Sequence, residues 1–330
     1  MNARENNQRR GVLKALVIAA GLMLMGPAWS SAYPAKPIRF IVSGAPGGGT
    51  DSVTRIVANG IGEAKQWQMV VENMPGAGGN IGMRQVATAA QDGYTIGMGE
   101  SSNLVINPFL YTKLPFDIEK DLAPVGLVGK VPLVLVVGSG SPYTSVQALM
   151  EAAKQKTLFF ASAGSGSVGH LTGELWKRQA GFNATHVPYK SAAPAMADVA
   201  GGQVDYFFAS VSSAMPLLQA GRVRPLAVTA GTRLELLPDV PTFDELGQKE
   251  MHAEVIYGVV APRGTPDDVI EALNTGLNDF LVTPAARRAL ANLGADATAM
   301  GGSVVQFDQL LKAEREKWSV VVKASGARVD

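Results

Sequence analysis

The segment from Phe40 to Asp51, FIVSGAPGGGTD, constrains the fold of this chain more than any other stretch. It begins as a short apolar strand, continues through four glycines and one proline between Gly44 and Gly49, and ends where a helix is predicted to begin. Glycine lets the backbone turn its N–H groups inward because it has no Cβ. A helix N-terminus adds free N–H donors and the positive end of the helix dipole. The segment therefore predicts a site for an anion such as a carboxylate or phosphate, and the alternative is a tight strand-to-helix turn.

The chain after this segment alternates strands and helices. Apolar runs predict strands at 38–42, 69–72 and 94–98, and helical spacing of apolar residues predicts helices at 51–64 and 81–90. This βαβαβ order indicates a parallel sheet with helices on its faces, so the fold class is α/β. The later predicted elements are strands near 125–128, 132–137, 158–161, 185–187, 204–208, 225–229 and 255–261, and helices near 145–154, 168–179, 192–200, 213–220, 267–281 and 304–325.

A second loop of small residues, Ser162 to Ser167, lies between a strand and a helix in the middle of the chain. Its serine hydroxyls and the following helix N-terminus suit a carboxylate without a full counter-charge. His170 is expected one turn into that helix, either in contact with a ligand or buried and bonded to backbone. Ligands of open α/β sheets bind beyond the carboxyl ends of strands, so two such loops predict a cleft between two lobes.

Each of two aspartates near these loops has two possible roles. Asp51 and Asp205 each either orient a water or a ligand hydroxyl, or cap a helix and pair locally.

The first 32 residues have the pattern of an export signal. Four basic residues at positions 4, 9, 10 and 14 precede an apolar stretch at 15–25 that is too short to span a bilayer, and small residues lead to a predicted cut after Ala32. The pair Arg9-Arg10 also resembles a twin-arginine signal, so both the general secretory and the twin-arginine routes stay open. A buried N-terminal helix is the other alternative. Removal of the segment takes away four basic residues and Glu5, which changes the formal charge from +1 to −2.

Composition narrows the possible partners. At 330 residues and 47% hydrophobic content the chain is long enough for about two domains. Charged residues make up 17% and form no basic block, so no nucleic-acid partner is predicted. Cysteine is absent, which excludes disulfides and a lipid anchor on cysteine. After the signal no apolar run approaches the ~20 residues of a membrane span, so a soluble mature protein is expected.

Catalytic motifs are incomplete, and no catalytic residue, metal ligand or cofactor is predicted. The first loop has the spacing of a phosphate-binding P-loop, but Thr50 stands where lysine is required. No serine has the glycines of a nucleophile elbow, and the three histidines lack metal-ligand spacing. The glycines at 164, 166 and 169 match a dinucleotide fingerprint, but the strand at 185–187 is not followed by an acid for a ribose.

Motifs along residues 33–330 resemble those of the periplasmic substrate-binding proteins of tripartite tricarboxylate transporters. They occur here in family order: YPAKPIRFIV, APGGGTD, VVENMPGAGGNIG, DGYTIGMG, INPFLY, ASAGSGSVGHL, HVPYKSAAPAMADVAGGQVD, AVTAGTR, LPDVPTFDELG and APRGTP.

The resemblance implies a two-lobed, type II periplasmic-binding-protein fold that closes on a small organic carboxylate in the inter-lobe cleft. Lobe 1 would comprise 33–132 and 255–330, and lobe 2 would comprise 133–254. The protein would be a periplasmic monomer that delivers its ligand to integral-membrane permease subunits. With the loops above, the family pattern gives these ligand-binding candidates: Ala45, Gly47, Gly48, Gly49, Thr50, Asp51, Ser101, Ser102, Ser162, Ala163, Ser165, Ser167, His170, Asp205 and Ser210.

The sequence departs from the family pattern in the expected pocket wall. Ser43-Gly44 replaces a proline and an aromatic residue, and Ser210 stands where Asp or Asn is common. The sequence therefore does not specify which carboxylate is bound. An exported ligand sensor on the same fold and an exported α/β enzyme are the alternative functions.

Overall fold

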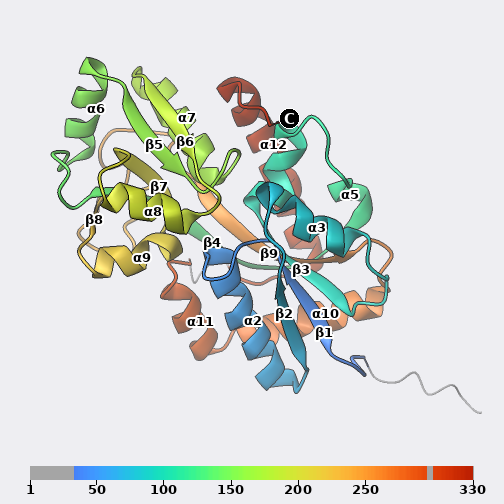
Figure 1. The fold of residues 1–330 in the computed structure, drawn as a ribbon. Helices are drawn as coiled ribbons and strands as arrows, with labels where there is room; N and C mark the ends of the chain where they lie inside the picture. Colours follow the sequence, from blue (N-terminus) through green and yellow to red (C-terminus); the bar gives the residue numbers. More distant parts are fainter. Residues whose placement is uncertain (1–32, 296–299, 330) are drawn as a thin grey trace, which may run out of the picture. The chain divides into compact units, whose positions relative to one another are not determined.

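The computed structural model describes residues 33–295 and 300–329, and the predicted export signal lies outside these residues. Residues Lys36–Asp330 form a compact unit, and the elements below belong to it. Its strands form a nine-stranded sheet in the order β2-β1-β3-β9-β4-β7-β5-β6, with β8 pairing β4. Figure 1 shows β1–β3 on one side of β9 and β4, and β5–β7 on the other.

The first part of the sheet is parallel, as the βαβαβ pattern predicts. Strand β1 (Ile38–Val42) pairs in parallel with both β2 (Met69–Asn73) and β3 (Thr95–Glu100). Helix α2 (Gly49–Lys65) joins β1 to β2, and α3 (Asn80–Ala87) joins β2 to β3 after the short 3₁₀ turn η1 (Ala77–Gly79). The loop after β1 therefore lies at the carboxyl edge of this part of the sheet.

The centre of the sheet is antiparallel. Strand β9 (Glu254–Pro262) pairs antiparallel with β3 and with β4 (Leu122–Gly138). Two strands were predicted at 125–128 and 132–137, whereas β4 runs through both as one strand, with two register shifts against β9 and one against β8. Its first half pairs with β9 and its second half with β7 and β8, so β4 crosses from one part of the sheet to the other.

The second part of the sheet again has a parallel core. Strand β5 (Leu158–Ser162) pairs in parallel with β6 (Ala184–Pro188) and β7 (Tyr206–Ser210). The remaining elements of this part are α6 (Val146–Gln155), α7 (Val168–Ala180), α8 (Ala192–Ala200), α9 (Val211–Gln219) and β8 (Val223–Val228). Ser145 caps α6, because its hydroxyl accepts the N–H of Ala148.

Several short elements were not predicted. The segment after β3 forms a π-helix, η2 (Ser102–Ile106), which continues into α4 (Asn107–Leu110) with Pro108 at its start. Proline is tolerated there because it occupies the first turn, where its missing N–H has no helical partner. Helices α5 (Ile118–Asp121) and α11 (Pro284–Ala291) were also missed, and both are short.

The long C-terminal helices cover the part of the sheet formed by β1–β4 and β9. Helix α10 (Asp267–Leu281) crosses α2 closely, since the Phe280 ring occupies the space that a Cβ at Gly60 would need. Helix α12 (Val304–Ser325) packs against β4, η2, α4 and α7. A buried aromatic cluster of Trp176, Tyr206, Phe208 and Phe243 fills the core beside β7. The loops at the carboxyl strand ends are thus attached to a rigid frame.

The start of α12 is fixed by a capping box, which gives a stability prediction. The Ser303 hydroxyl accepts the N–H of Gln306, and the Gln306 side chain accepts the N–H of Ser303. We expect Ser303→Ala to lower the free energy of unfolding by about 1 kcal/mol. Ser319→Ala, in the same helix but away from its N-terminus, should change it by less than about 0.5 kcal/mol. Equal unfolding free energies for the two variants in urea would contradict this role.

Candidate ligand-binding site

The first glycine-rich loop is held by its own backbone and by Asp51. The N–H of Gly48 donates to the Ala45 carbonyl at 3.1 Å, and the N–H of Gly47 donates to the Asp51 carboxylate at 2.9 Å. Gly47 has φ +75°, a conformation that favours glycine. Ala45 and Gly49 are half-buried, whereas Gly47 is exposed, so the loop borders solvent.

Helix α2 begins without a side-chain cap. Gly48 occupies the N-cap position, and no side chain accepts an N–H of the first turn. In the described part of the chain, no acceptor bonds the N–H groups of Gly49, Thr50 and Asp51. By contrast, α7 and α9 are capped by the hydroxyls of Ser167 and Ser210. The first turn of α2 therefore retains the donors and the positive dipole end that an anion needs.

The Asp51 carboxylate stabilises the first loop through hydrogen bonds. Its carboxylate accepts hydrogen bonds from Arg55, Gly47 and Asn73, and the side chain is buried. Burial alone would raise the pKa of Asp51, but these hydrogen bonds outweigh it and hold the pKa below its usual value. Asp51 is thus ionised and paired with Arg55, as the local-pairing interpretation predicts.

Polar groups from three further elements converge on the start of α2. A Cβ at Gly49 would lie 2.8 Å from the Tyr257 hydroxyl of β9 and 2.9 Å from the Ser212 hydroxyl of α9, with Ser210 at 3.7 Å. The Ser210 hydroxyl lies 3.0 Å from that of Ser212. The structure therefore brings the predicted residues Gly49 and Ser210 together, although they come from distant parts of the sequence.

Glu100 is a member of this group that the sequence analysis did not select. It is the last residue of β3, and its Oε2 accepts the Thr50 hydroxyl at 2.9 Å. Burial raises its pKa, although hydrogen bonds from Thr50 and Ser102 oppose the shift. Tyr257, its Cα partner on β9, was also missed, and burial raises the pKa of its hydroxyl. Only the register of β3 with β9 places these two side chains together, and that register cannot be read from spacing.

The two serines after Glu100 have different environments. Ser101 is fully buried, and its hydroxyl accepts the N–H of Ile256 on β9 at 2.8 Å. This bond fastens the end of β3 to β9. The Ser102 hydroxyl, by contrast, donates a hydrogen bond to the Glu100 carboxylate.

The second small-residue loop is also organised internally. The Ser162 hydroxyl, fully buried, accepts the N–H of Gly164 at 3.1 Å and lies 2.6 Å from His186 Nε2. Ala163 and Ser165 are half-buried, and among the described residues no partner bonds the Ser165 hydroxyl. Ser167 caps α7 by accepting the N–H of His170.

His170 is buried and bonded to backbone, which was one of the two interpretations of this residue. Its Nδ1 accepts the N–H of Gly166 at 3.0 Å, and its ring stacks on His186 with centroids 3.7 Å apart. The accepting Nδ1 assigns the ring proton to Nε2. Burial, with Lys177 as a smaller cause, lowers the pKa of His170 from 6.5 to about 4. Burial and the neighbouring His170 lower the pKa of His186 to about 3. Both rings are neutral near pH 7.

Segment 102–110, formed by η2 and α4, contacts both loops. At one end Asn103 donates to the hydroxyl of Ser43, just before the first loop, at 3.0 Å. At the other end the Leu110 side chain lies against Gly166 of the second loop. The two predicted loops are thus attached to the same short segment.

The structure does not bring Asp205 to this group. Asp205 precedes β7, at the opposite end of that strand from Ser210, which is roughly 16 Å away for five residues of extended chain. Its carboxylate accepts the N–H of Phe159 at 2.8 Å and lies 3.5 Å from the Tyr143 hydroxyl. Strand β7 begins at Tyr206 rather than at the predicted residue 204. Asp205 therefore lies just before the amino end of the strand, away from the carboxyl ends where the two loops lie.

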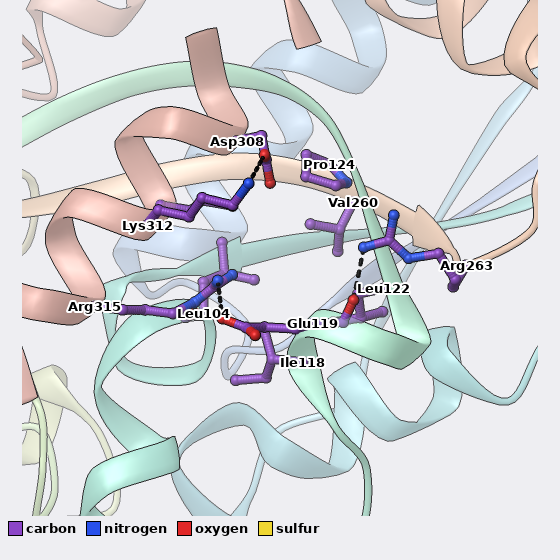
Figure 2. A pocket seen from close by; sticks show the side chains of 11 residues that line it. Leu104, Ile118, Glu119, Leu122, Pro124, Val260, Arg263, Asp308, Lys312 and Arg315 are labelled. Carbon is purple, nitrogen blue, oxygen red and sulfur yellow. Dashed lines mark hydrogen bonds and ion pairs between the residues drawn. The ribbon is translucent and has the colours of Figure 1, made fainter. Parts of the chain in front are cut away.

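A separate cavity of about 220 Å³ lies beside α12 and contains none of the predicted site residues. Figure 2 shows that its charged side chains are paired with each other or with backbone. Arg315 pairs with Glu119 at 2.8 Å and Lys312 pairs with Asp308. This cavity therefore offers no free charge for a ligand, and the convergence around Gly49 is the better candidate.

The described residues contain neither a metal-ligand cluster nor a helix that could span a membrane. Within 33–295 and 300–329, no group of three or more His, Asp or Glu side chains is placed to hold a metal ion. In the same residues no helix combines the length and the apolar character needed to cross a membrane.

Comparisons with known proteins agree with this architecture. Residues 53–327 match the family described as TctC, the tripartite tricarboxylate transporter family receptor. The chain is 36% identical over 320 residues to the UPF0065 protein in the tcbD-tcbE intergenic region of Pseudomonas sp. (strain P51), which covers 96% of this chain and 94% of that protein.

Solved structures show the same fold. The structure of R. palustris Rpa4515 with adipate has a TM-score of 0.86 and 34% identity, covering 90% of this chain and 100% of that one. MatC from Rhodopseudomonas palustris with bound malate has a TM-score of 0.80 and 30% identity, covering 88% and 100%. The predicted α/β fold of periplasmic binding proteins is confirmed, whereas the lobe boundaries stay a prediction.

The neutral histidine pair predicts an acid-dependent loss of stability. Because the pKa of His170 is lower in the folded chain, the unfolded chain binds more protons as the pH falls from about 6.5 towards 4. A shift from 6.5 to about 4 corresponds to a loss of about 3 kcal/mol across this range. We expect His170→Gln to show a shallower decrease of unfolding free energy between pH 7 and 4 than the parent chain.

The control for this experiment is His252→Gln. His252 is an exposed histidine paired with Asp244 on the surface. Its removal leaves the buried pair of His170 and His186 in place, so the acid-dependent loss attributed to that pair should persist. If His170→Gln kept the full slope of the parent chain, the buried pair would not be its cause.

Proposed function

Because the chain belongs to the tripartite tricarboxylate transporter receptor family, we propose that it captures a small organic carboxylate outside the cytoplasm and delivers it to a membrane permease. The observation that carries this proposal is the uncapped first turn of α2. Its three N–H groups lack acceptors in the described residues, and they lie at the carboxyl edge of the sheet. Donors in such a position bind a carboxylate without a catalytic group.

The second loop supplies the other part of the proposed site. Ser165 offers a hydroxyl without a partner among the described residues, and the N-terminus of α7 follows two residues later. The relatives with bound adipate and malate hold small acids with two carboxylates. Two loops with N–H and hydroxyl donors suit a ligand of this class.

Capture is proposed to occur by closure of two lobes, 33–132 with 255–330 and 133–254. Strands β4 and β9 are the connections between them in this division, since β4 pairs first with β9 and then with β7 and β8. Closure requires only that the ligand bind the closed state better than the open one. The protein would act as a monomer in the periplasm after removal of residues 1–32.

An exported sensor on the same fold would bind the same ligand, and a pull-down of permease subunits separates the two functions. An exported enzyme has less support, because the family and the similar structures are binding proteins. Turnover of an ester or hydroxy acid by the pure protein, abolished in Ser167→Ala, would favour the enzyme.

A thermal-shift screen of small organic acids tests the proposed function. A ligand that binds only the folded state raises the melting temperature by mass action, by the equivalent of about 2.7 kcal/mol at a concentration 100 times its Kd. We expect at least one mono- or dicarboxylate to raise the melting temperature of the mature chain, whereas matched neutral amides should not. A screen in which acids and amides behave alike would contradict carboxylate capture.

Substitution of Gly48 tests the position of the site. Gly48 has φ −77°, so other residues fit its backbone, but a Cβ there would lie 3.2 Å from the Ala45 carbonyl beside the free N–H groups. We expect Gly48→Leu to weaken binding of the acid found in the screen at least tenfold by calorimetry, with little change in the melting temperature of the free protein. Gly140→Leu is the control, because a Cβ at Gly140 meets nothing within 4 Å. Equal affinities for both variants would place the ligand elsewhere.

A further inference from the structure

Glu100 places a carboxyl group beside an anion-binding helix end, which requires an explanation. Its Oε2 accepts the hydroxyl of Thr50, the second residue of α2, whose own N–H has no acceptor among the described residues. Thr50 is 6% exposed and Glu100 is half-buried, so this contact is partly shielded from solvent. Glu100 also lies directly opposite Tyr257 in the pairing of β3 with β9.

No positive charge compensates Glu100. None of the ion pairs in the described residues includes it, and its hydrogen-bond donors are the neutral hydroxyls of Thr50 and Ser102. Tyr257 faces it from β9 and is itself kept neutral by burial, while Ser210 and Ser212 approach the same point from β7 and α9. The nearest charged pair on α2 is Asp51 with Arg55, and Asp51 faces the first loop and Asn73.

An ionised Glu100 would oppose the proposed function. Two carboxylates at one helix end repel each other, and a half-buried site without a cation strengthens the repulsion relative to open water. A neutral Glu100 has the opposite effect, since its O–H donates a hydrogen bond. Hydrogen bonds from a neutral acid to an anionic oxygen are short and about twice as strong as those between neutral groups.

We propose that Glu100 is a specificity-determining residue that binds as the neutral acid and donates its proton to a hydrogen bond with the carboxylate seated on the first turn of α2. The inference rests on the proposed function and deepens it. No bond is made or broken, because Glu100 keeps its proton within the O–H···O⁻ pair. The raised pKa of the carboxyl is consistent with this role.

Two consequences follow. The site favours ligands with an anionic oxygen at the α2 end and disfavours ligands with an ammonium group there. Affinity should fall as the pH rises above the point at which Glu100 ionises, by up to tenfold per pH unit.

The test uses the mature chain with adipate and malate as probes in calorimetry, and compares the parent with Glu100→Gln and Glu100→Leu. Glutamine keeps a neutral donor of the same length, so Glu100→Gln should retain affinity within about tenfold and bind independently of pH. Leucine removes the donor, so Glu100→Leu should lose about 10- to 100-fold. Glu151→Gln removes an exposed carboxylate from α6 and should behave as the parent.

Infrared difference spectra of the parent minus Glu100→Gln give a readout that does not depend on affinity. The proposal predicts the carbonyl stretch of a protonated carboxyl in the complex. It also predicts that this band titrates over the pH range in which the parent loses affinity. Absence of the band at neutral pH, or a Glu100→Leu variant as tight as Glu100→Gln, overturns the inference while the proposed function stands. If no acid in the screen binds the parent, both fail.

Without ligand, the Glu100 carboxyl should also affect how the free energy of unfolding depends on pH. Since the folded-state pKa of Glu100 is raised, its contribution to the free energy of unfolding decreases as the pH rises above about 4.5. The melting temperature of Glu100→Gln should therefore gain on that of the parent as the pH rises from 5 to 8. A difference that is the same at both pH values counts against a neutral Glu100 in the folded chain.

Discussion

The pairing of β9 with both β3 and β4 is the constraint on which the site depends. Strand β9 returns from residue 254 and lies antiparallel between two strands that are far apart in sequence. This register places Tyr257 opposite Glu100 and lets Ser101 accept an N–H from β9. The end of β3 is thereby fixed against the start of α2. Without β9 the polar groups around Gly49 would belong to separate halves of the sheet.

The chemistry of the site follows from what the protein leaves unpaired. Buried polar groups are usually hydrogen-bonded, and the second loop obeys that rule through Ser162, His186 and His170. The first turn of α2 departs from it, because glycine replaces the Ser or Asp that would cap it. Asp51 reinforces the loop but faces Arg55 and Asn73, so it does not fill the turn. Free donors next to an otherwise satisfied frame are the feature expected of a preformed anion site.

Much of this arrangement was predictable from local sequence. The order of strands and helices, both small-residue loops and the cap at Ser145 follow from periodicity, glycine placement and capping rules. The continuous strand β4 was predicted as two strands because Gly129 and Lys130 interrupt its apolar run, and glycine within a strand weakens it. The π-helix η2 has no comparable signal, since its apolar residues suit several conformations.

The composition of the site was harder to predict because it depends on register. Gly49 and Ser210 were selected from local motifs, and the structure brings them close together. Asp205 was selected as well, but it lies at the opposite end of β7 from Ser210. Glu100 and Tyr257 lie on apolar strands, where the hydrophobic pattern predicts only core or strand-end positions for them. Only long-range pairing shows that they meet.

The most direct measurement of the central claim is the backbone amide spectrum of the labelled mature chain during titration with a carboxylate that raises its melting temperature. If the first turn of α2 holds the anion, the N–H signals of Gly49, Thr50 and Asp51 shift strongly, because new hydrogen bonds form at those groups. Amides at the amino end of β7, near Asp205, should move little. Saturation of binding with those three signals unmoved would contradict the account.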